Sequence, residues 1–348
     1  MSLKQRLIEQ ITLEGPMNVA DYMARCLLDP IDGYYTRHVR IGADGDFLTA
    51  PMVSQMFGEM IGVWVAQMWQ ALGAPAEFRL VEIGGGDGTL MSDIVRVAKR
   101  VPGLFDAARV MMVEPSPRLR ALQGQTLAGV VFVPDVNAVP TELPVIVIAN
   151  EVLDCLPARQ FVRTEDGWAE RCVGVVDDDL AFGLTPTEYK PAIDAAPGQI
   201  VEVSAAQQHF AAQLGALLKA ATGAALLIDY GRDQAEAGDT LQALYNHHNT
   251  DPLTAPGEHD LTVWADFPAA TDVGKTFVKL SKIKTQSEFL HRLGILSRRE
   301  ALQAAHPSHA EKLRRQYDRL TAPDQMGTLF KVIGMAWPAA LPLFALED

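Results

Sequence analysis

A glycine-rich turn between an apolar run and a helical pattern constrains this sequence more than any other feature. The run Phe78–Ile83 is typical of a buried strand, Gly84–Gly88 of a tight turn, and Thr89–Arg100 of a helix. Glycine allows left-handed backbone angles and lets a ligand approach the main chain, and the helix presents free amide groups. The sequence therefore predicts a ligand-binding turn at the edge of a sheet.

Further apolar runs alternate with helical patterns after this turn. They cover residues 109–114, 130–133 and 144–149, with a helical stretch near Arg118–Leu127, and the last part of the chain adds runs at 223–230, 276–283 and 328–337. Strands that are buried on both faces read as continuous apolar runs, as in parallel sheets. We therefore expect an α/β fold with a doubly wound, Rossmann-like sheet.

The pattern along the chain also predicts its division into domains. We expect an N-terminal helical cap over residues 1–75, which includes a helix at Gln55–Leu72 after Ser54, and a main domain over 76–348. Strand-like pieces among Pro, Gly and Asp indicate a β-rich insertion at about 157–205. A helical insertion at about 285–322 is marked by three capping-box pairs, namely Thr285 with Glu288, Ser297 with Glu300, and Ser308 with Glu311.

Charge and composition narrow the classes of partner. The net charge is −13, from 43 acidic and 30 basic residues, so the surface repels phosphate backbones and we expect no nucleic-acid partner. The same charge suits a cationic ligand, although acidic surfaces also serve solubility alone. The three cysteines and the scattered histidines lack the spacing of a metal site, so no metal is expected.

The sequence also contains features that bear on the location of the protein in the cell. No apolar run reaches the roughly 18 residues needed for a membrane span, and Glu9 and Glu14 lie where a signal or transit peptide would be apolar or free of acids. The uneven cysteine count indicates a reducing compartment. From these features we expect a cytoplasmic protein.

Three ligand classes compete for the glycine turn. A P-loop requires a lysine, and none occurs between Phe78 and Ala98. A dinucleotide fingerprint needs a third glycine where this chain has Thr89. The actual G-x-G-x-G spacing, with Glu82 before it, resembles the S-adenosylmethionine (AdoMet) site of class I methyltransferases. AdoMet carries a sulfonium cation and no phosphate, so an acidic residue at the strand end is tolerable.

The resemblance to that site implies a set of cofactor-binding residues. The glycines run beneath the methionine portion, Glu114 at the next strand end accepts the ribose hydroxyls, and Asp135 lies where it can bond the adenine amino group. Asp46 and Thr49 are expected to fold over the cofactor and exclude water. The alternative for the two strand-end acids is an exposed loop position without ligand contact. The complete predicted set is Glu82, Gly84, Gly86, Gly88, Thr89, Glu114, Asp135, Asp46 and Thr49.

Several segments together resemble one narrower family. They are Gly45–Thr49 with Pro51, Ala149–Glu151 with Asp154 and Leu156–Pro157, Ile228–Gly231, Gly238–Gln242, Asp260–Thr262, and Met326–Gly327 with Leu329–Lys331. With the glycine turn, they make the sequence similar to the MidA-type family, which includes a mitochondrial protein-arginine methyltransferase that acts in complex I assembly. The resemblance implies an AdoMet-dependent protein-arginine N-methyltransferase that acts on a subunit of respiratory NADH dehydrogenase and aids its assembly. Met52, Trp264 and Ala265 depart from the family pattern.

The catalytic residues are expected at the end of the run that precedes Asn150. An arginine substrate stays protonated at neutral pH, so carboxylates must orient it and hold its charge. We expect Glu151 and Asp154 to clamp or deprotonate the substrate and Asn150 to orient it; the alternative is a simple turn closed by Pro157. Two other functions stay open: a non-catalytic assembly chaperone with this fold, and a methyltransferase for another protein or a small molecule. A homodimer is also left open.

Overall fold

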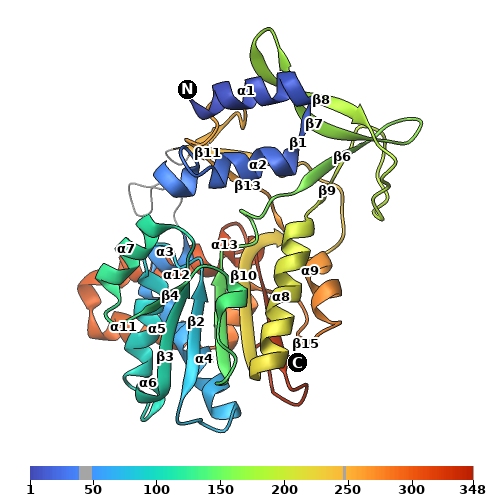
Figure 1. Ribbon diagram of the computed structural model, residues 1–348. Helices are drawn as coiled ribbons and strands as arrows, with labels where there is room; N and C mark the ends of the chain where they lie inside the picture. The colour runs from blue at the N-terminus through green and yellow to red at the C-terminus, as the bar shows by residue number, and fades with distance from the viewer. Residues whose placement is uncertain (39–48, 246–247, 348) are drawn as a thin grey trace. The chain divides into compact units, whose positions relative to one another are not determined.

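The computed structural model describes residues 1–38, 49–245 and 248–347 and forms two compact units (Figure 1). The N-terminal unit combines Met1–Phe47, Leu153–His209 and Gln234–Ala269. The sheet unit combines Leu48–Val152, Phe210–Asp233 and Ala270–Asp348. The division into a cap of residues 1–75 and a main domain of 76–348 stays a prediction.

The sheet unit is built on a mixed sheet with the strand order β15-β17-β10-β5-β2-β3-β4, and β16 also pairs with β17. The strands from β4 to β10 are parallel to their neighbours, whereas β17 is antiparallel to β10. Strand order reverses between β2 and β5, which makes this edge the topological switch point where α/β sheets bind ligands. The bounds are β2 (Phe78–Ile83), β3 (Ala108–Val113), β4 (Val131–Val133), β5 (Val145–Asn150), β10 (Gly223–Arg232), β15 (Lys279–Leu280), β16 (Lys284–Thr285) and β17 (Phe330–Trp337).

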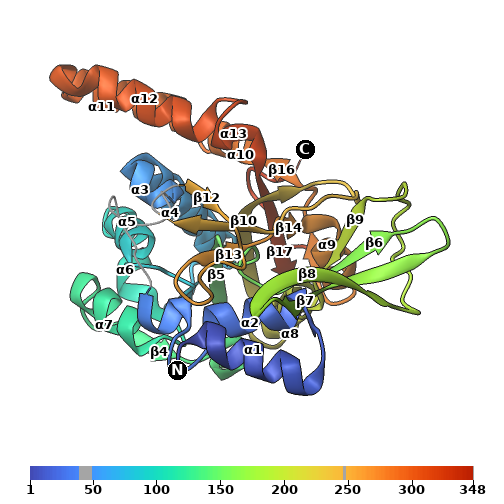
Figure 2. The same cartoon turned by 90° about the horizontal axis from the view of Figure 1, so that it is seen from above.

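Helices cover both faces of this sheet, as the doubly wound prediction requires. Every residue of β5 and β10 is buried, which explains why β5 and the first six residues of β10, 223–228, read as apolar runs. Right-handed crossovers place helices on opposite faces once the strand order reverses. Figure 2 shows α4 and α5 on one side of the sheet and α8 on the other. The bounds are α3 (Ala50–Val53), α4 (Gln55–Ala71), α5 (Thr89–Ala98), α6 (Leu104–Ala107), α7 (Pro117–Thr126), α8 (Ala205–Ala221) and α9 (Phe267–Gly274).

Helices α10 to α12 lie between Gln286 and Thr321, but two of the three capping boxes predicted there are wrong. Thr285 accepts from the Glu288 amide and forms the predicted box at the start of α10. Helix α11 begins earlier than predicted, after Gly294 at φ 92°, because the buried Ile295 already belongs to its first turn. Helix α12 begins after His309 with no side-chain cap. The bounds are α10 (Gln286–Arg292), α11 (Ile295–Ala305), η3 (Pro307–His309), α12 (Ala310–Thr321) and α13 (Met326–Leu329).

The strand predicted over residues 276–283 is mostly wrong. Within this range only the two residues of β15 form a strand that pairs with β17. The preceding residues turn back on α9 instead, because Phe277 and Val278 both donate to the Gly274 carbonyl. The Phe277 side chain packs on Gly215 of α8, where any added Cβ would lie 2.6 Å from it.

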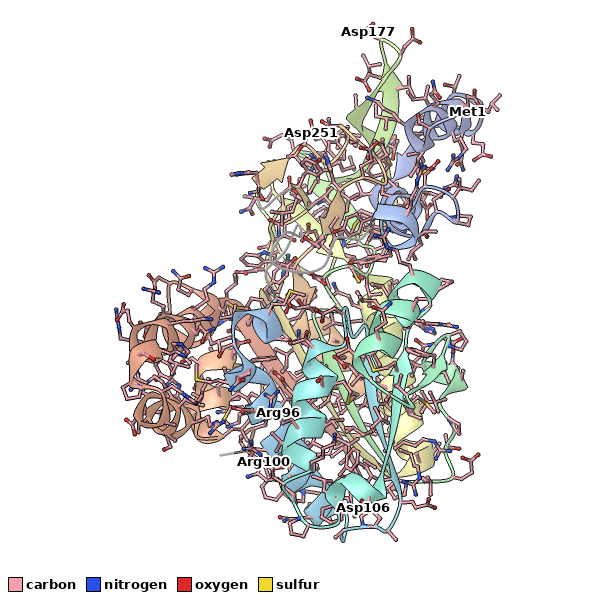
Figure 3. The ribbon with its side chains drawn as sticks, turned by 90° about the vertical axis from the view of Figure 1, so that its left-hand side faces the viewer. Met1, Arg96, Arg100, Asp106, Asp177 and Asp251 are labelled. Carbon is pink, nitrogen blue, oxygen red and sulfur yellow. The ribbon has the colours of Figure 1, made fainter. Side chains whose placement is uncertain are left out.

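The N-terminal unit contains two antiparallel sheets and the first helices of the chain. One sheet has the order β1-β7-β6-β9 with β8 on β7, and the other has the order β12-β11-β13. The β-rich element expected in this part of the chain is therefore present. Asp177 and Asp178, at φ 50° and 62°, form the tip of the β7–β8 hairpin (Figure 3). The bounds are α1 (Leu3–Glu14), β1 (Met17–Asn18), α2 (Val19–Leu28), η1 (Tyr34–His38), β6 (Arg159–Arg163), β7 (Trp168–Val176), β8 (Asp179–Pro186), β9 (Ile200–Val203), β11 (Gln242–Tyr245), β12 (His248–Thr250), β13 (Asp260–Thr262) and β14 (Ala265–Asp266).

Among the described residues, no helix has the length and apolar character needed to cross a membrane.

Candidate functional site

The turn between β2 and α5 has a backbone that glycine alone adopts without strain. Gly84, Gly86 and Gly88 have φ values of 66°, 55° and 84°. At Gly85 a side chain is excluded by steric overlap, since a Cβ would lie 2.1 Å from the Met112 Cε atom of β3. The turn therefore brings bare main chain to the switch point of the sheet.

The start of α5 is occupied by a carboxylate of the chain itself. Asp87 Oδ1 accepts the Thr89 amide at 2.9 Å, and the Gly88 amide donates to the Gly85 carbonyl at 2.8 Å. A negative group at this place repels a phosphate that would otherwise bind a helix N-terminus. The turn thus fits a ligand without phosphate, such as AdoMet.

Glu82 adds a second buried acid beside the turn. Its side chain lies on β2 and is 2% exposed, and its Oε2 has no hydrogen-bond partner among the described residues. Burial, followed by the nearby charge of Asp87, raises the pKa of Glu82 to about 8. A cationic ligand would stabilise the ionised form, so this position also fits a sulfonium or ammonium group.

Glu114 lies just after β3 and is held at both of its carboxylate oxygens. It is 3% exposed; Oε1 accepts the Ser116 amide at 2.9 Å and Oε2 accepts Gln123 Nε2 at 3.1 Å. Burial raises the pKa of Glu114, while these two hydrogen bonds act in the opposite direction. Gln123 also donates to the Gly86 carbonyl at 2.9 Å. Gln123 was not among the predicted site residues, although it links two predicted cofactor positions.

Asp135 follows β4 and has a local structural role. Its Oδ1 accepts the amides of Asn137 at 2.8 Å and Ala138 at 3.2 Å, so it caps the short 3-10 helix η2 (Val136–Ala138). The side chain is exposed. Its predicted contact with adenine stays a prediction.

Asn150 and Glu151 end β5 on the other side of the switch point. Asn150 Nδ2 donates to Glu151 Oε1 at 2.9 Å, and the Glu151 amide donates to the Ile228 carbonyl of β10 at 2.8 Å. Glu151 has φ 54°, a strained value for a residue with a side chain. Asn150 Oδ1 is buried and has no hydrogen-bond partner among the described residues. The two side chains therefore form a preorganised polar pair.

The beginning of α3 reaches this pair. Thr49 is the N-cap residue of α3, and the Ala50 amide donates to Glu151 Oε1 at 3.3 Å. The structure thus brings the segment after Thr49 to Glu151. Asp46, the other predicted residue of this segment, lies outside the described residues.

Asp154 belongs to the N-terminal unit. Its side chain is 7% exposed, and its carbonyl accepts the Val263 amide at 2.9 Å. Gln207 Nε2 donates to the neighbouring Leu153 carbonyl at 2.8 Å. The backbone at Asp154 is therefore fixed to the segment that follows β13. Within the described ranges, no three His, Cys, Asp or Glu side chains are grouped to hold a metal ion.

A Rossmann-like sheet with a phosphate-repelling glycine turn at its switch point defines the class of AdoMet-dependent methyltransferases. Comparison with known sequences agrees, because residues 60–284 match the model of a family described as S-adenosyl-L-methionine-dependent methyltransferases. The protein belongs to this family.

Curated relatives cover nearly the whole chain. The protein named arginine methyltransferase NDUFAF7, mitochondrial, of Danio rerio is 31% identical over 98% of this chain and 88% of its own length. The protein of the same name from Xenopus tropicalis is 34% identical over 95% of this chain and 84% of its own length. A Burkholderia thailandensis crystal structure with bound S-adenosyl-homocysteine superposes with a TM-score of 0.87 at 29% identity, covering 99% of this chain and 94% of that one. AdoMet is accordingly the cofactor.

The cytoplasmic location predicted from the sequence is contradicted by these comparisons. The curated relatives carry mitochondrial names. The acids near the N-terminus, from which the location was inferred, describe the local composition of helix α1 and do not locate the protein.

Proposed function

We propose that this methyltransferase acts on an arginine side chain of a subunit of respiratory NADH dehydrogenase and thereby aids assembly of that complex. Support for the substrate class comes from the relatives that are named arginine methyltransferases over nearly the full chain. Support from the site comes from the Asn150–Glu151 pair, which presents a carboxylate and a buried amide oxygen at the switch point, where α/β sheets bind their ligands.

The donor is proposed to lie along the β2–α5 turn. Bound AdoMet supplies an activated methyl group on its sulfonium sulfur and leaves as S-adenosylhomocysteine. Glu82 and Asp87 face its positive charges, and Glu114 accepts the ribose hydroxyls. The proposed contacts comprise Glu82, Gly84, Gly86, Gly88, Thr89, Glu114 and Asp135, with Asp46 and Thr49 covering the site.

The acceptor chemistry is proposed for the end of β5. An arginine guanidinium stays protonated at neutral pH, so its nitrogen becomes nucleophilic only when carboxylates orient it and remove a proton. Glu151 is proposed to orient the guanidinium and take the proton released when the nitrogen–methyl bond forms. Asn150 Oδ1 accepts one guanidinium N–H, and Asp154 supplies a second carboxylate.

Mass spectrometry of the subunits of respiratory NADH dehydrogenase tests the proposal. Cells that lack this protein should lose a methyl mass shift on one subunit arginine, and the wild-type protein should restore it. Glu151→Gln should fail to restore the shift. Glu165→Gln, a matched change in an exposed turn, should restore it fully.

The same experiment separates the competing functions. If Glu151→Gln supports complex assembly as well as the wild type does, and no subunit arginine changes mass, the protein is an assembly chaperone. If a purified small molecule is methylated instead and every subunit is unchanged, the substrate class proposed here is wrong.

A further inference from the structure

Gln123 is a buried polar residue that the methyl-transfer chemistry described above does not use. It lies on α7, one helical turn after Leu119, and is 0% exposed. These are the two buried residues of that helix, so its packed face consists of one leucine and one glutamine. Packing alone would favour a second apolar side chain, since a buried amide must satisfy its hydrogen bonds inside the protein.

The neighbours of Gln123 fix the orientation of its amide. Nε2 donates to the Gly86 carbonyl at 2.9 Å and to Glu114 Oε2 at 3.1 Å. Both partners are acceptors, so the nitrogen must face them and both of its hydrogens are used. Oε1 is buried without a hydrogen-bond partner among the described residues. The residue therefore retains a costly arrangement that serves two specific acceptors.

These acceptors belong to the two ends of the cofactor site. Gly86 lies in the turn assigned to the methionine portion of the donor, and Glu114 is the carboxylate assigned to its ribose. Ser116 holds Glu114 Oε1 at 2.9 Å while Gln123 holds Oε2, so each oxygen has a fixed direction and keeps lone pairs for a ligand hydroxyl.

From this geometry we infer that Gln123 is a positioning residue that couples the ribose-binding carboxylate of Glu114 to the glycine turn and so sets the selectivity for ribose hydroxyls. The inference rests on the proposed assignment of Glu114 to the ribose. In this arrangement the Glu114 carboxylate has its binding orientation before the ligand arrives. A freely rotating side chain at position 114 would instead lose conformational entropy on binding, which would weaken the affinity.

Helix α7 supplies a matched control. Thr126, one turn further along, donates from Oγ1 to the Asp87 carbonyl at 3.1 Å. It contacts the same turn, and within the described part of the chain its hydrogen bond goes to Asp87 and not to Glu114. Thr126→Val therefore removes one α7–turn hydrogen bond and leaves the carboxylate held, whereas Gln123→Met removes the bonds to both acceptors at similar side-chain volume.

Isothermal titration calorimetry tests the inference with two ligands, S-adenosylhomocysteine and its analogue that lacks the 2′ and 3′ hydroxyls. The wild type should prefer the natural ligand by about 100-fold, and Gln123→Met should reduce this ratio to roughly 10-fold or less. Thr126→Val should keep the wild-type ratio. A ratio in Gln123→Met equal to that of the wild type, in a protein that unfolds at the wild-type temperature, would overturn the inference.

Glu114→Gln distinguishes failure of the inference from failure of the cofactor assignment. If this variant also discriminates like the wild type, Glu114 does not bind the ribose and the assignment itself is wrong. If it loses discrimination while Gln123→Met keeps it, the assignment holds and only the coupling is wrong.

The pH profile of binding gives a readout that loss of packing would not move. The charged groups that face Glu114 are Arg120 of α7 and Glu82 of β2. The Gln123 hydrogen bond lowers the pKa of Glu114, so its removal raises that pKa. Affinity should then begin to fall at a higher pH on acidification in Gln123→Met than in the wild type. Thr126→Val should show the wild-type profile, and an unshifted profile in Gln123→Met would contradict the coupling.

Discussion

The chain adopts left-handed backbone angles after both strands at the switch point, β2 and β5, but with different residue types. After β2 the left-handed residues are glycines, at 84, 86 and 88, and the turn carries no side chain at these positions. After β5 the left-handed residue is Glu151, which carries a full side chain at φ 54°. The turn after β2 exposes main chain without side chains, whereas the end of β5 has a strained backbone at a residue that carries a carboxylate.

The difference agrees with the proposed division of the site into a cofactor-binding part and a catalytic part. A bare turn lets a ligand approach the backbone closely at little conformational cost. Glu151 has a strained backbone, and its Oε1 accepts hydrogen bonds from Asn150 and Ala50. The orientation of its carboxylate is therefore fixed before the substrate binds. Changes in the turn should therefore act on cofactor affinity, and changes at the end of β5 should act on turnover.

The largest effect is expected for Gly86→Val. A β-branched residue at φ 55° is strongly disfavoured, so the backbone of the turn should change. AdoMet affinity should fall by about 100-fold or more by calorimetry. Gly124→Ala, on α7 with open space around it, should bind AdoMet like the wild type. Full affinity in Gly86→Val would mean that the cofactor lies elsewhere.

Glu151→Gln should affect the other half of the comparison. The amide keeps the size of the side chain and removes the charge that is proposed to hold the guanidinium, so kcat should fall by roughly 100-fold. The dissociation constant of AdoMet should stay within about twofold of the wild type, because the glycine turn is untouched. A variant with normal kcat and weakened AdoMet binding would place Glu151 in the cofactor site and reverse the division proposed here.

The regular elements around both strand ends could be predicted from the sequence. β2 has the predicted bounds, and α4 begins at the predicted residue after Ser54. Long apolar runs and a strong N-cap residue act locally, so a single sequence carries their signal. Where tertiary packing competes, the local signal fails: Ser297 has capping-box spacing, yet the buried Ile295 starts the helix earlier.

The sequence indicated candidate residues of the site but not the hydrogen bonds that connect them. The motif order indicated Glu82, Glu114 and the pair at 150 and 151, whose proposed roles await experiment. Gln123 was missed because a helical glutamine is usually exposed, and its partners Gly86 and Glu114 are distant in sequence. The one available signal was its spacing of four from Leu119, which places both on one helix face.

The buried Glu82 beside the glycine turn should make the stability of the protein depend on pH. Its pKa is raised to about 8 in the folded protein from an ordinary 4.5, so the folded state binds more protons than the unfolded state between these values. Stability without cofactor should therefore fall as pH rises through this window, by at most about 1.4 kcal/mol per pH unit. Urea unfolding of the wild type and Glu82→Gln checks this. The glutamine variant should show a shallower decline, and equal slopes would mean that Glu82 ionises normally.

The smallest expected effect tests the backbone difference itself. Glu151→Gly and Glu151→Ala both remove the carboxylate, so the stability difference between the two variants reports the backbone alone. At φ 54° the glycine variant should be more stable than the alanine variant by about 1 kcal/mol in urea unfolding. Position 124 of α7 provides the opposite case, because there alanine should be more stable than glycine by roughly 0.5–1 kcal/mol. The same order at both positions would show that the end of β5 stores no strain, and the carboxylate of Glu151 would then owe its direction to its hydrogen bonds alone.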